Sequence, residues 1–319
     1  MAHALAPTRE PRTPLTEPGT LVHFASDMYA TFAADVTLEA ANAELARGGQ
    51  WLPIDGDPAL TLGELLLTDS TGPLRLGYGA WRDLLLGLQF SNGRGELISA
   101  GGMTVKNVAG YDLTKFLVGS AGCFGTPVTL TTRTHRLPDG ALIADLEKGD
   151  DAFVHGIIQT DLRPQWIIAH TNGLTLGYIG KRRQLAFWEA ELRDGMDGPA
   201  IDRIRGIGLD RADELRRQLW PAPPVGNLRV ALPPASAVAA LRSSDAPTWA
   251  VDPVHGIAVA NADDPNALAD KLASHGGNAV VYTDGKPTRW DVAENVRPLL
   301  ARLKHRFDPD DTLPPLPIS

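Results

Sequence analysis

The sequence of 319 residues contains a single cysteine, Cys123, which excludes an intramolecular disulfide framework. One thiol cannot by itself make a thiolate-rich metal site. The eight histidines are scattered, and none of them forms the H-x-H or H-x-x-x-H pairs that place two imidazoles on one metal ion. We therefore predict no metal ligands in this chain.

Membrane-spanning segments and nucleic-acid-binding surfaces also lack support in the sequence. No stretch approaches the roughly 20 uncharged apolar residues that a membrane helix needs, and the N-terminus has no basic segment followed by an apolar run. Lys and Arg total 30 against 38 Asp and Glu, and the resulting net charge of -8 opposes docking on phosphate backbones. We predict no transmembrane segment, no nucleic-acid partner and a cytoplasmic location.

What the sequence does have is the composition of a folded globular protein. Its apolar fraction of 43% and charged fraction of 21% are near globular averages, and its length suggests two compact units. The first residues differ from the rest, because they hold four prolines and few large apolar side chains. Such a composition cannot offset the entropy lost on ordering, so we predict a flexible N-terminal arm over residues 1–20.

Hydrophobic patterns predict a strand, helix, strand unit near the start of the folded part. Residues 29–36 and 50–54 are short apolar runs, and between them Thr37 has the properties of a helix N-cap. Strong helix formers follow Thr37 up to Gly48-Gly49, which ends the helix. Residues 59–71 have mixed periodicity and precede a turn at Gly72-Pro73. Farther on, Ser91-Asn92-Gly93-Arg94-Gly95 predicts a tight reversal between two strands within residues 80–98.

The character of the sequence changes beyond Pro138-Asp139-Gly140, and we place a domain boundary there, between residues 21–140 and 141–319. Strands and helices then alternate without the long parallel run of a doubly wound sheet, which favours an α+β second domain. Strands are expected at residues 225–232 and 278–282, and as a pair within 167–180 around Asn172-Gly173. Helices are expected at residues 181–196, 210–219, 265–275 and 291–306.

The most unusual stretch is the glycine-rich segment that ends at Gly125. Asp112 can cap a short helix, and glycines at 119, 122 and 125 then leave little side-chain bulk. Backbone amides in such a segment can approach a ligand phosphate or ring closely. The glycines precede a strand-like run at 128–134 instead of following a strand, so this is not the Rossmann fingerprint. The alternative interpretation is a turn that serves packing alone.

The run Lys106-Asn107-Val108-Ala109-Gly110-Tyr111-Asp112-Leu113, followed after a spacer by Gly122-Cys123-Phe124-Gly125, resembles a motif of the FAD-binding subunits of glycolate oxidases. These belong to the p-cresol-methylhydroxylase-type (PCMH-type), vanillyl-alcohol-oxidase-like FAD-binding superfamily. The resemblance extends over residues 29–138 and includes Tyr78-Gly79-Ala80-Trp81-Arg82-Asp83. It is weaker beyond them, where Leu303-Lys304-His305-Arg306-Phe307-Asp308-Pro309 is similar to the end of the family's sequences.

This resemblance implies an α+β fold, in which a PCMH-type FAD-binding domain with an incomplete first lobe precedes a smaller α+β cap domain. The final helix of the cap domain is expected to return to the FAD-binding domain. The implied function is that of the FAD-binding subunit of a glycolate oxidase-like 2-hydroxy-acid oxidoreductase complex. Its cofactor is FAD, its substrate a small 2-hydroxy acid, and its partners a larger FAD-binding catalytic subunit and an iron-sulfur subunit.

The resemblance also implies which residues contact the cofactor. Residues of the glycine-rich segment line the flavin through their backbones, and polar residues before it hold the segment in place. For Lys106 and Asp112 the alternative is a solvated pair at a helix end. The candidate FAD-binding residues are Gly63, Gly72, Lys106, Asn107, Gly110, Asp112, Gly119, Ser120, Gly122, Cys123 and Gly125.

Several positions depart from the family's pattern. Its first glycine-rich phosphate loop would fall in the first 28 residues, where only Gly19 is present. Glu64 stands where a second glycine is expected, and Asp69 adds another charge that would repel a pyrophosphate. Pro127 and Pro314-Pro315-Leu316-Pro317 replace residues with free amides. These departures leave open an alternative, a non-catalytic assembly subunit that keeps the fold and has lost or weakened FAD binding.

No catalytic residue is nominated. His135, His170 and His255 have the ordinary interpretation of packed or exposed histidines. His275 precedes Gly276-Gly277, which is similar to a short motif of the family's cap domain, and this makes it the best polar candidate near a substrate. Ser120 lacks a G-x-S-x-G context, so a hydrolase nucleophile is not indicated.

Overall fold

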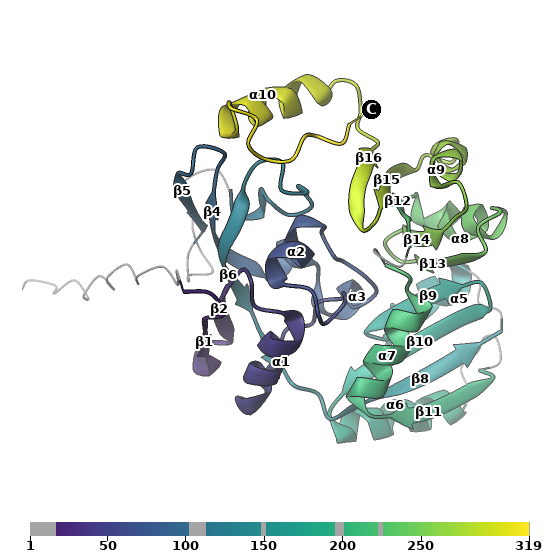
Figure 1. The fold of residues 1–319 in the computed structure, drawn as a ribbon. Coiled ribbons are helices and arrows are strands. Elements are labelled where there is room, and N and C mark those ends of the chain that lie inside the picture. Colours follow the sequence, from purple (N-terminus) through teal and green to yellow (C-terminus); the bar gives the residue numbers. More distant parts are fainter. Residues whose placement is uncertain (1–16, 102–112, 148–150, 195–200, 223–225, 319) are drawn as a thin grey trace, which may run out of the picture.

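The computed structural model describes residues 17–101, 113–147, 151–194, 201–222 and 226–318. The described chain forms two sheet-containing layers that face each other (Figure 1). The first layer comes from the N-terminal part, drawn in purple and blue, and the second from the part drawn in teal and green. None of the helices in these ranges is long and apolar enough to cross a membrane.

The first layer is built on a five-stranded antiparallel sheet. Its strands are β1 (Leu21–Phe24), β2 (Tyr29–Ala33), β4 (Leu85–Ser91), β5 (Leu97–Gly101) and β6 (Thr126–Arg133). Across the sheet their order is β1-β2-β6-β4-β5. The strand predicted at residues 29–36 is confirmed as β2, and the predicted reversal is confirmed between β4 and β5.

Short helices and a two-stranded ribbon complete this layer. They are η1 (Ala25–Asp27), α1 (Leu38–Arg47), β3 (Gln50–Trp51), α2 (Leu62–Leu67), α3 (Arg75–Tyr78), α4 (Trp81–Leu84), η2 (Leu113–Lys115) and β7 (His135–Arg136). The predicted N-cap is confirmed, because the Thr37 hydroxyl accepts a hydrogen bond from the Ala40 amide at 3.2 Å. The strand expected at residues 50–54 is confined to β3, which pairs with β7 outside the five-stranded sheet.

Helix α2 was not predicted, because six residues are too few to show a helical period among the mixed residues 59–71. A capping box starts it. The Glu64 amide donates to the Thr61 hydroxyl at 3.2 Å, and the Thr61 amide donates to the Glu64 carboxylate at 2.8 Å. Glu64, which stands where the family's pattern has a glycine, therefore lies in a helix and is part of its N-terminal cap.

The second layer is a nine-stranded sheet whose neighbouring strands pair antiparallel. Its strands are β8 (Gly140–Leu146), β9 (Trp166–His170), β10 (Gly173–Gly180), β11 (Arg203–Ile207), β12 (Leu228–Ala231), β13 (Thr248–Asp252), β14 (Ile257–Asn261), β15 (Asn278–Thr283) and β16 (Lys286–Trp290). Their order is β11-β8-β10-β9-β13-β14-β12-β15-β16. The strand pair predicted around Asn172-Gly173 is confirmed as β9 and β10, whereas a smaller cap was expected and this sheet is the larger one.

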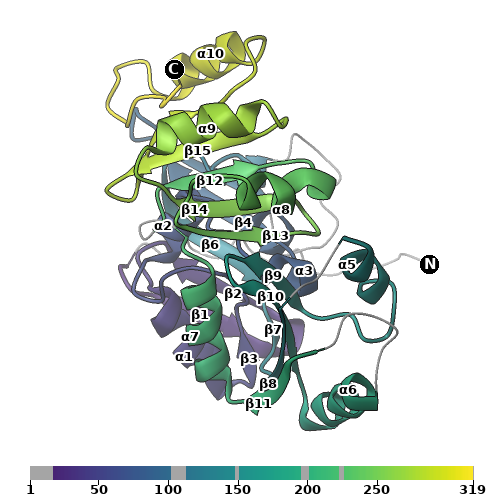
Figure 2. The ribbon, with the colours of Figure 1, turned by 90° about the vertical axis from the view of Figure 1, so that its right-hand side faces the viewer.

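Helices cover the two faces of the nine-stranded sheet unequally. Those of this part of the chain are α5 (Asp151–Ile157), α6 (Arg182–Asp194), α7 (Leu209–Leu219), α8 (Pro234–Arg242) and α9 (Pro265–Ala273). Apolar residues of α5, α6, α8 and α9 pack on the face that Figure 2 turns toward the viewer. Helix α7 lies on the other face, next to the first layer. The predicted helices at 181–196, 210–219 and 265–275 are confirmed as α6, α7 and α9.

The two layers share a buried apolar cluster. Trp51 and Leu74 of the first layer are fully or almost fully buried in it, against Trp166 and Ala250 of the second sheet. Because burial of such side chains removes apolar surface from water, this contact stabilises the packing of the two layers. Strand β8 begins at the predicted boundary, but the division into domains at residues 140/141 stays a prediction.

The C-terminal helix α10 (Arg297–Phe307) packs against the first layer, above β4 and β6 (Figure 1). The ring centroid of Phe307 lies 4.7 Å from that of Phe116 and 6.1 Å from that of Phe90. This helix was expected from residue 291 but begins only at Arg297. The chain then returns to the second sheet, where Ile318 forms a parallel bridge with Trp290 of β16.

Candidate functional site

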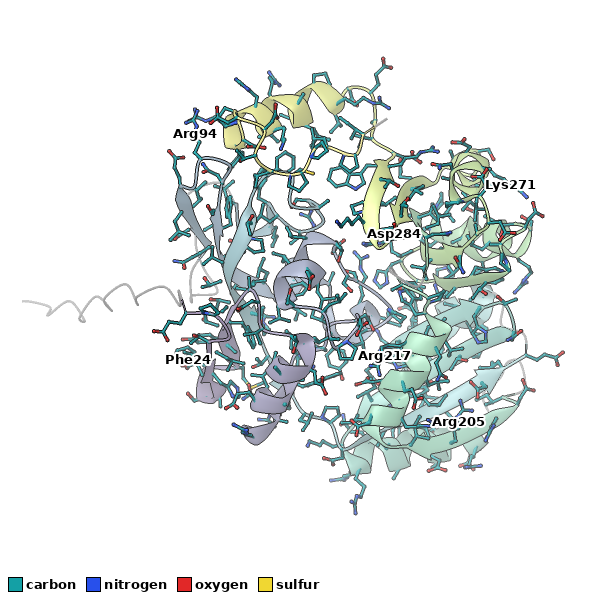
Figure 3. The ribbon with its side chains drawn as sticks, in the orientation of Figure 1. Phe24, Arg94, Arg205, Arg217, Lys271 and Asp284 are labelled. Atoms are coloured by element: carbon teal, nitrogen blue, oxygen red, sulfur yellow. The ribbon has the colours of Figure 1, made fainter. Side chains whose placement is uncertain are left out.

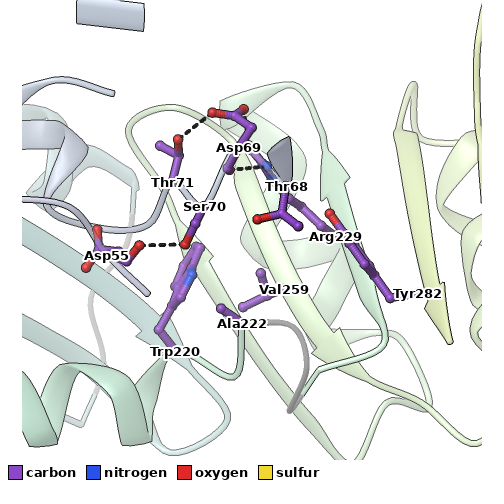
Figure 4. Close-up of a pocket in the computed structure, with 10 residues that line it drawn as sticks. All are labelled: Asp55, Thr68, Asp69, Ser70, Thr71, Trp220, Ala222, Arg229, Val259 and Tyr282. Atoms are coloured by element: carbon purple, nitrogen blue, oxygen red, sulfur yellow. Dashed lines mark hydrogen bonds and ion pairs between the residues drawn. The ribbon is translucent and has the colours of Figure 1, made fainter. Parts of the chain in front are cut away.

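A cavity of about 260 Å³ lies between the two layers. One wall is formed by the end of α2 and by the glycine-rich turn, and the other by strands β12, β15 and β16. A smaller cavity of about 20 Å³ adjoins it and shares four of its residues (Figure 4). The larger cavity is lined by Leu67, Thr68, Asp69, Val118, Gly119, Arg229, Ala231, Ile257, Asn278, Val280, Tyr282, Pro287 and Trp290.

An ion pair joins the two walls of this cavity. The Arg229 guanidinium donates to the Asp69 carboxylate at 3.0 Å and to the Asp69 carbonyl at 2.7 Å. Burial acts to lower the pKa of Arg229, but the Asp69 carboxylate more than offsets this and the pKa lies above its usual value. Arg229 therefore stays charged. Burial raises the pKa of the neighbouring Tyr282 hydroxyl, so Tyr282 stays neutral at physiological pH.

Asp69 reaches this position through the backbone at the end of α2. Its φ of +46° lies in the left-handed region, which a residue other than glycine adopts at a cost of about 1 kcal/mol. The Thr71 hydroxyl donates to the second carboxylate oxygen of Asp69 at 2.8 Å. Both oxygens of Asp69 thus have partners within the protein, and the carboxylate is not a free charge in the cavity.

A second and deeper ion pair also crosses between the layers. Arg216 of α7 donates to Asp55 of the first layer at 2.6 Å and to Asp213 of its own helix at 2.6 Å. The Leu74 amide donates to the other Asp55 oxygen at 2.9 Å. Burial acts to lower the pKa of Arg216, but the two carboxylates raise it above its usual value. This pair fixes the α7 face of the second layer against the first.

The glycine-rich turn caps the end of α2. The Gly119 amide donates to the Leu66 carbonyl at 3.0 Å, and the Ala121 amide donates to the Leu67 carbonyl at 2.9 Å. These carbonyls belong to the last turn of α2 and would otherwise lack helical partners. The Cys123 amide is also bonded within the turn, to the Ser120 carbonyl at 3.0 Å. Several amides of the turn are therefore already used by the protein and are not free for a phosphate.

The predicted FAD-binding residues of this turn are distributed between the cavity and its surroundings. Gly119 lines the cavity, with a left-handed φ of +74°. Gly122 and Cys123 lie beneath the C-terminal segment: a Cβ on Gly122 would be 3.7 Å from the Pro314 ring, and the Cys123 thiol donates to the Pro315 carbonyl at 3.1 Å. The Ser120 hydroxyl is buried without a hydrogen-bond partner among the described residues.

The other predicted glycines support packing. A Cβ on Gly125 would lie 2.6 Å from the Phe90 ring, and one on Gly63 would lie 2.9 Å from the Ala34 carbonyl oxygen. A Cβ on Gly72 would lie 2.8 Å from the Asp55 side chain, so this glycine leaves room for the deeper ion pair. Lys106, Asn107, Gly110 and Asp112 lie outside the described residues.

Arg229, Asn278, Tyr282 and Trp290 were missed at the level of sequence, although all of them line the cavity. The one available signal was Arg229, a charged residue between the apolar Leu228 and Val230 in a predicted strand. Histidines do not line the cavity, and no cluster of three potential metal ligands occurs in the part of the chain that the structure describes.

The cavity fits the flavin ring of FAD better than the pyrophosphate. Its walls are largely apolar, with Asn278 and Tyr282 as hydrogen-bonding side chains, which suits an uncharged aromatic ring system. Ligand pockets usually measure about 300–1,000 Å³, so a cavity of about 260 Å³ has room for the ring and not for the whole dinucleotide. The bonded amides of the turn do not fit the role of a pyrophosphate cradle.

Part of the chain is similar to a family of FAD-binding domains. Residues 18–113 match the family described as FAD binding domain. The structure is similar over 94% of this chain and 67% of the other to alkyldihydroxyacetonephosphate synthase, with a TM-score of 0.61 and 13% identity. At that identity the likeness shows the fold alone, and it supports the fold class predicted from the sequence.

The similar curated sequences include two glycolate oxidase subunits. Subunit GlcE of Escherichia coli (strain K12) is 35% identical over 40% of this chain and 37% of its own length. Subunit GlcD of Bacillus subtilis (strain 168) is 36% identical over 28% of this chain and 19% of its own length. A mitochondrial D-lactate dehydrogenase [cytochrome] of Arabidopsis thaliana is 30% identical over 32% of this chain and 18% of its own length.

These matches confirm the predicted resemblance. Residues 18–113 of the chain match an FAD binding domain family, and the chain is similar to glycolate oxidase subunits. It spans less than two fifths of the length of each of these curated relatives.

Proposed function

We propose that this chain is the FAD-binding subunit of a glycolate oxidase-like 2-hydroxy-acid oxidoreductase complex, and that the cavity between its layers receives the flavin ring. The observation that carries the proposal is the cavity itself. One of its walls contains Leu67, Thr68 and Asp69, which belong to the segment that matches the FAD binding domain family. The other wall supplies polar groups from a different layer, as expected of a site at the contact between two units.

Bound FAD would supply the chemistry of hydride acceptance from a 2-hydroxy acid. The protein's own residues would bind and shield the ring. Leu67, Val118 and Trp290 provide apolar and aromatic surface, and Asn278 and Tyr282 provide hydrogen bonds. The partners in this proposal are a larger FAD-binding catalytic subunit and an iron-sulfur subunit. The similarity to two glycolate oxidase subunits supports a multi-subunit complex. The cytoplasmic location stays a prediction from the sequence.

One observation favours the alternative of a non-catalytic assembly subunit with the same fold. The Asp69–Arg229 ion pair spans the cavity, and amides of the neighbouring turn are engaged by the protein. A chain in this arrangement holds its two walls together without a cofactor. The two proposals differ in whether the purified chain binds FAD.

The direct test is the visible absorbance spectrum of the purified chain before and after addition of FAD, followed by removal of unbound cofactor. Flavin absorbance that stays with the protein supports the proposed function. A matched pair of variants sharpens the test. Asp69→Gly removes the carboxylate and the left-handed strain and releases Arg229 to donate hydrogen bonds to the carbonyl oxygens of the flavin ring. We expect FAD to bind this variant about tenfold more tightly, or ~1.4 kcal/mol.

The control is Asp284→Gly, because Asp284 also has a left-handed backbone, with φ of +50°, but lies exposed in the turn between β15 and β16 (Figure 3). It does not line the cavity, so its replacement should leave FAD affinity unchanged. If neither the natural chain nor folded Asp69→Gly retains FAD, the non-catalytic alternative is supported instead.

A further inference from the structure

The C-terminal part of the chain is fixed by a buried ion pair at the end of α10. Lys304 pairs with Asp308, and both are buried. The remaining donors of Lys304 reach the carbonyls of Leu313 at 3.1 Å and Pro314 at 2.9 Å. Asp308 in turn accepts from the Thr312 amide at 2.8 Å and the Leu313 amide at 2.9 Å. The chain is thus held firmly up to about Pro314.

Residues 314–318, which we call the C-terminal strap, continue from this point across the glycine-rich turn to β16. The Pro315 carbonyl accepts from the Cys123 thiol at 3.1 Å, and the Pro317 carbonyl accepts from the Trp290 amide at 2.6 Å. Leu316 is partly buried against the core of the first layer. Figure 1 shows this segment in yellow, between α10 and β16. The strap therefore bridges the turn and the edge strand next to the cavity.

The strap is weakly held compared with the segment that precedes it. Pro314 and Pro315 are exposed, and the described residues give residues 315–318 only the two hydrogen bonds just named and the bridge of Ile318. Its three prolines also offer no amide donors. Segments with few buried contacts open at a lower free energy than the core does.

Cys123 lies under this strap and is fully buried. Burial raises the pKa of its thiol to about 11, so in the closed state it is both shielded and protonated. The same strap lies over Gly122, where a Cβ would be in ordinary van der Waals contact with the Pro314 ring.

We propose that the C-terminal strap opens reversibly while both layers stay folded, and that this opening exposes the Cys123 thiol, which the closed strap covers. The fixed point of the motion is the Lys304–Asp308 pair. This inference does not depend on FAD, because it follows from how the chain covers its own turn.

Cys123 makes the opening measurable, since it is the only thiol in the chain. The rate of its reaction with Ellman's reagent is measured across a urea series well below global unfolding. Opening of the strap alone exposes little surface, so the rate should be nearly independent of urea in this range. A rate that follows the steep urea dependence of global unfolding overturns the proposal.

A pair of variants gives a second test. Pro314→Gly with Pro315→Gly makes the open strap more flexible and should raise the thiol reaction rate about tenfold. The control is Pro234→Gly with Pro265→Gly, at the first residues of α8 and α9, which pack on the nine-stranded sheet and not in the first-layer core that contains Cys123. It should leave the rate within about twofold of the natural chain. Equal rates in the two double variants contradict a local opening.

Discussion

At the scale of single residues, Glu64 shows how a side chain can be assigned to the wrong task. Placed by comparison with a cofactor loop, it was expected to repel a pyrophosphate. In the structure it is exposed, does not line the cavity and closes a capping box with Thr61. The T-x-x-E pattern before an apolar run is a known signature of a helix start. The sequence therefore contained the correct interpretation, and the resemblance obscured it.

This assignment predicts the effect of two substitutions. Glu64→Ala removes the acceptor of the Thr61 amide and should lower the free energy of unfolding by about 1 kcal/mol. Glu64→Gln keeps a side-chain oxygen at the same place and should lose less. Urea denaturation followed by tryptophan fluorescence measures both. Equal stability of the alanine variant and the natural chain, or a gain of FAD affinity in the alanine variant, would contradict the capping role.

The ion pair between Asp69 and Arg229 could not be predicted from the sequence. They are 160 positions apart in the sequence, and neither lies in a motif that points to the other. The adverse charge of Asp69 was recognised, but its partner comes from a different layer and depends on how the two sheets meet. Pairing of this kind is decided by tertiary packing, which local patterns do not contain.

At the scale of elements, the sequence predicted those helices and strands whose bounds are set by local signals. Asn172-Gly173 fixes the turn between β9 and β10, and Thr37 fixes the start of α1, because both act through neighbouring residues. Strands β13 and β14 had no such signal. Their residues are buried at consecutive positions, since both faces of the sheet are covered, and a continuous apolar run does not distinguish a strand from a buried helix.

The end of α10 gives a prediction about pH. Burial acts to raise the pKa of Asp308, but hydrogen bonds from Lys304, Leu313 and Thr312 hold it below its usual value. A carboxyl with a depressed pKa in the folded state stabilises the fold above its unfolded pKa of 3.8, and this contribution is lost as the pH falls toward the folded pKa.

Asp308→Asn cannot titrate, so its deficit in stability relative to the natural chain should be largest near neutral pH. Below about pH 4 the deficit should shrink by up to about 1.4 kcal/mol per pH unit, because only the natural chain loses the ionised carboxylate. Urea denaturation of both proteins from about pH 7 to about pH 3 measures the difference. A deficit that stays constant over this range means that Asp308 does not have the depressed pKa.

At the scale of the whole molecule, the fold follows from the resemblance, while the way its layers are joined does not. The resemblance predicts an FAD-binding unit and a cap, and the structure has two layers, built on a five-stranded and a nine-stranded sheet. The assignment of these roles to the two layers stays a prediction. The buried Asp55–Arg216 pair between them links residues 161 positions apart. A lone Asp after Pro53-Ile54 and one Arg among several on an amphipathic helix give no sign of this contact.

Substitutions of Asp55 and Arg216 test the contribution of this ion pair to the contact between the layers. Asp55→Ala leaves the buried Arg216 with only the partly exposed Asp213, and Arg216→Met leaves the buried Asp55 without its cation. Arg216→Met should lower the free energy of unfolding by about 3 kcal/mol, because an unpaired buried charge is costly. Asp55→Ala should lower it by less, because Asp213 still pairs with Arg216. The double variant should lose less than the sum, with a coupling of about 1–3 kcal/mol, since it leaves neither charge unpaired.

Exposed Glu189 and Arg193 on α6 provide the matched control pair, with a hydrogen bond of 2.8 Å and an expected coupling of about 0.3–0.5 kcal/mol. Urea denaturation followed by tryptophan fluorescence reports on both layers, because Trp81 lies in the first and Trp249 in the second. A coupling between Asp55 and Arg216 no larger than that of the surface pair would mean that apolar contacts alone hold the layers together. In that case the position of the Arg229 wall relative to Asp69 would depend on the shared cluster around Trp51 and not on this ion pair.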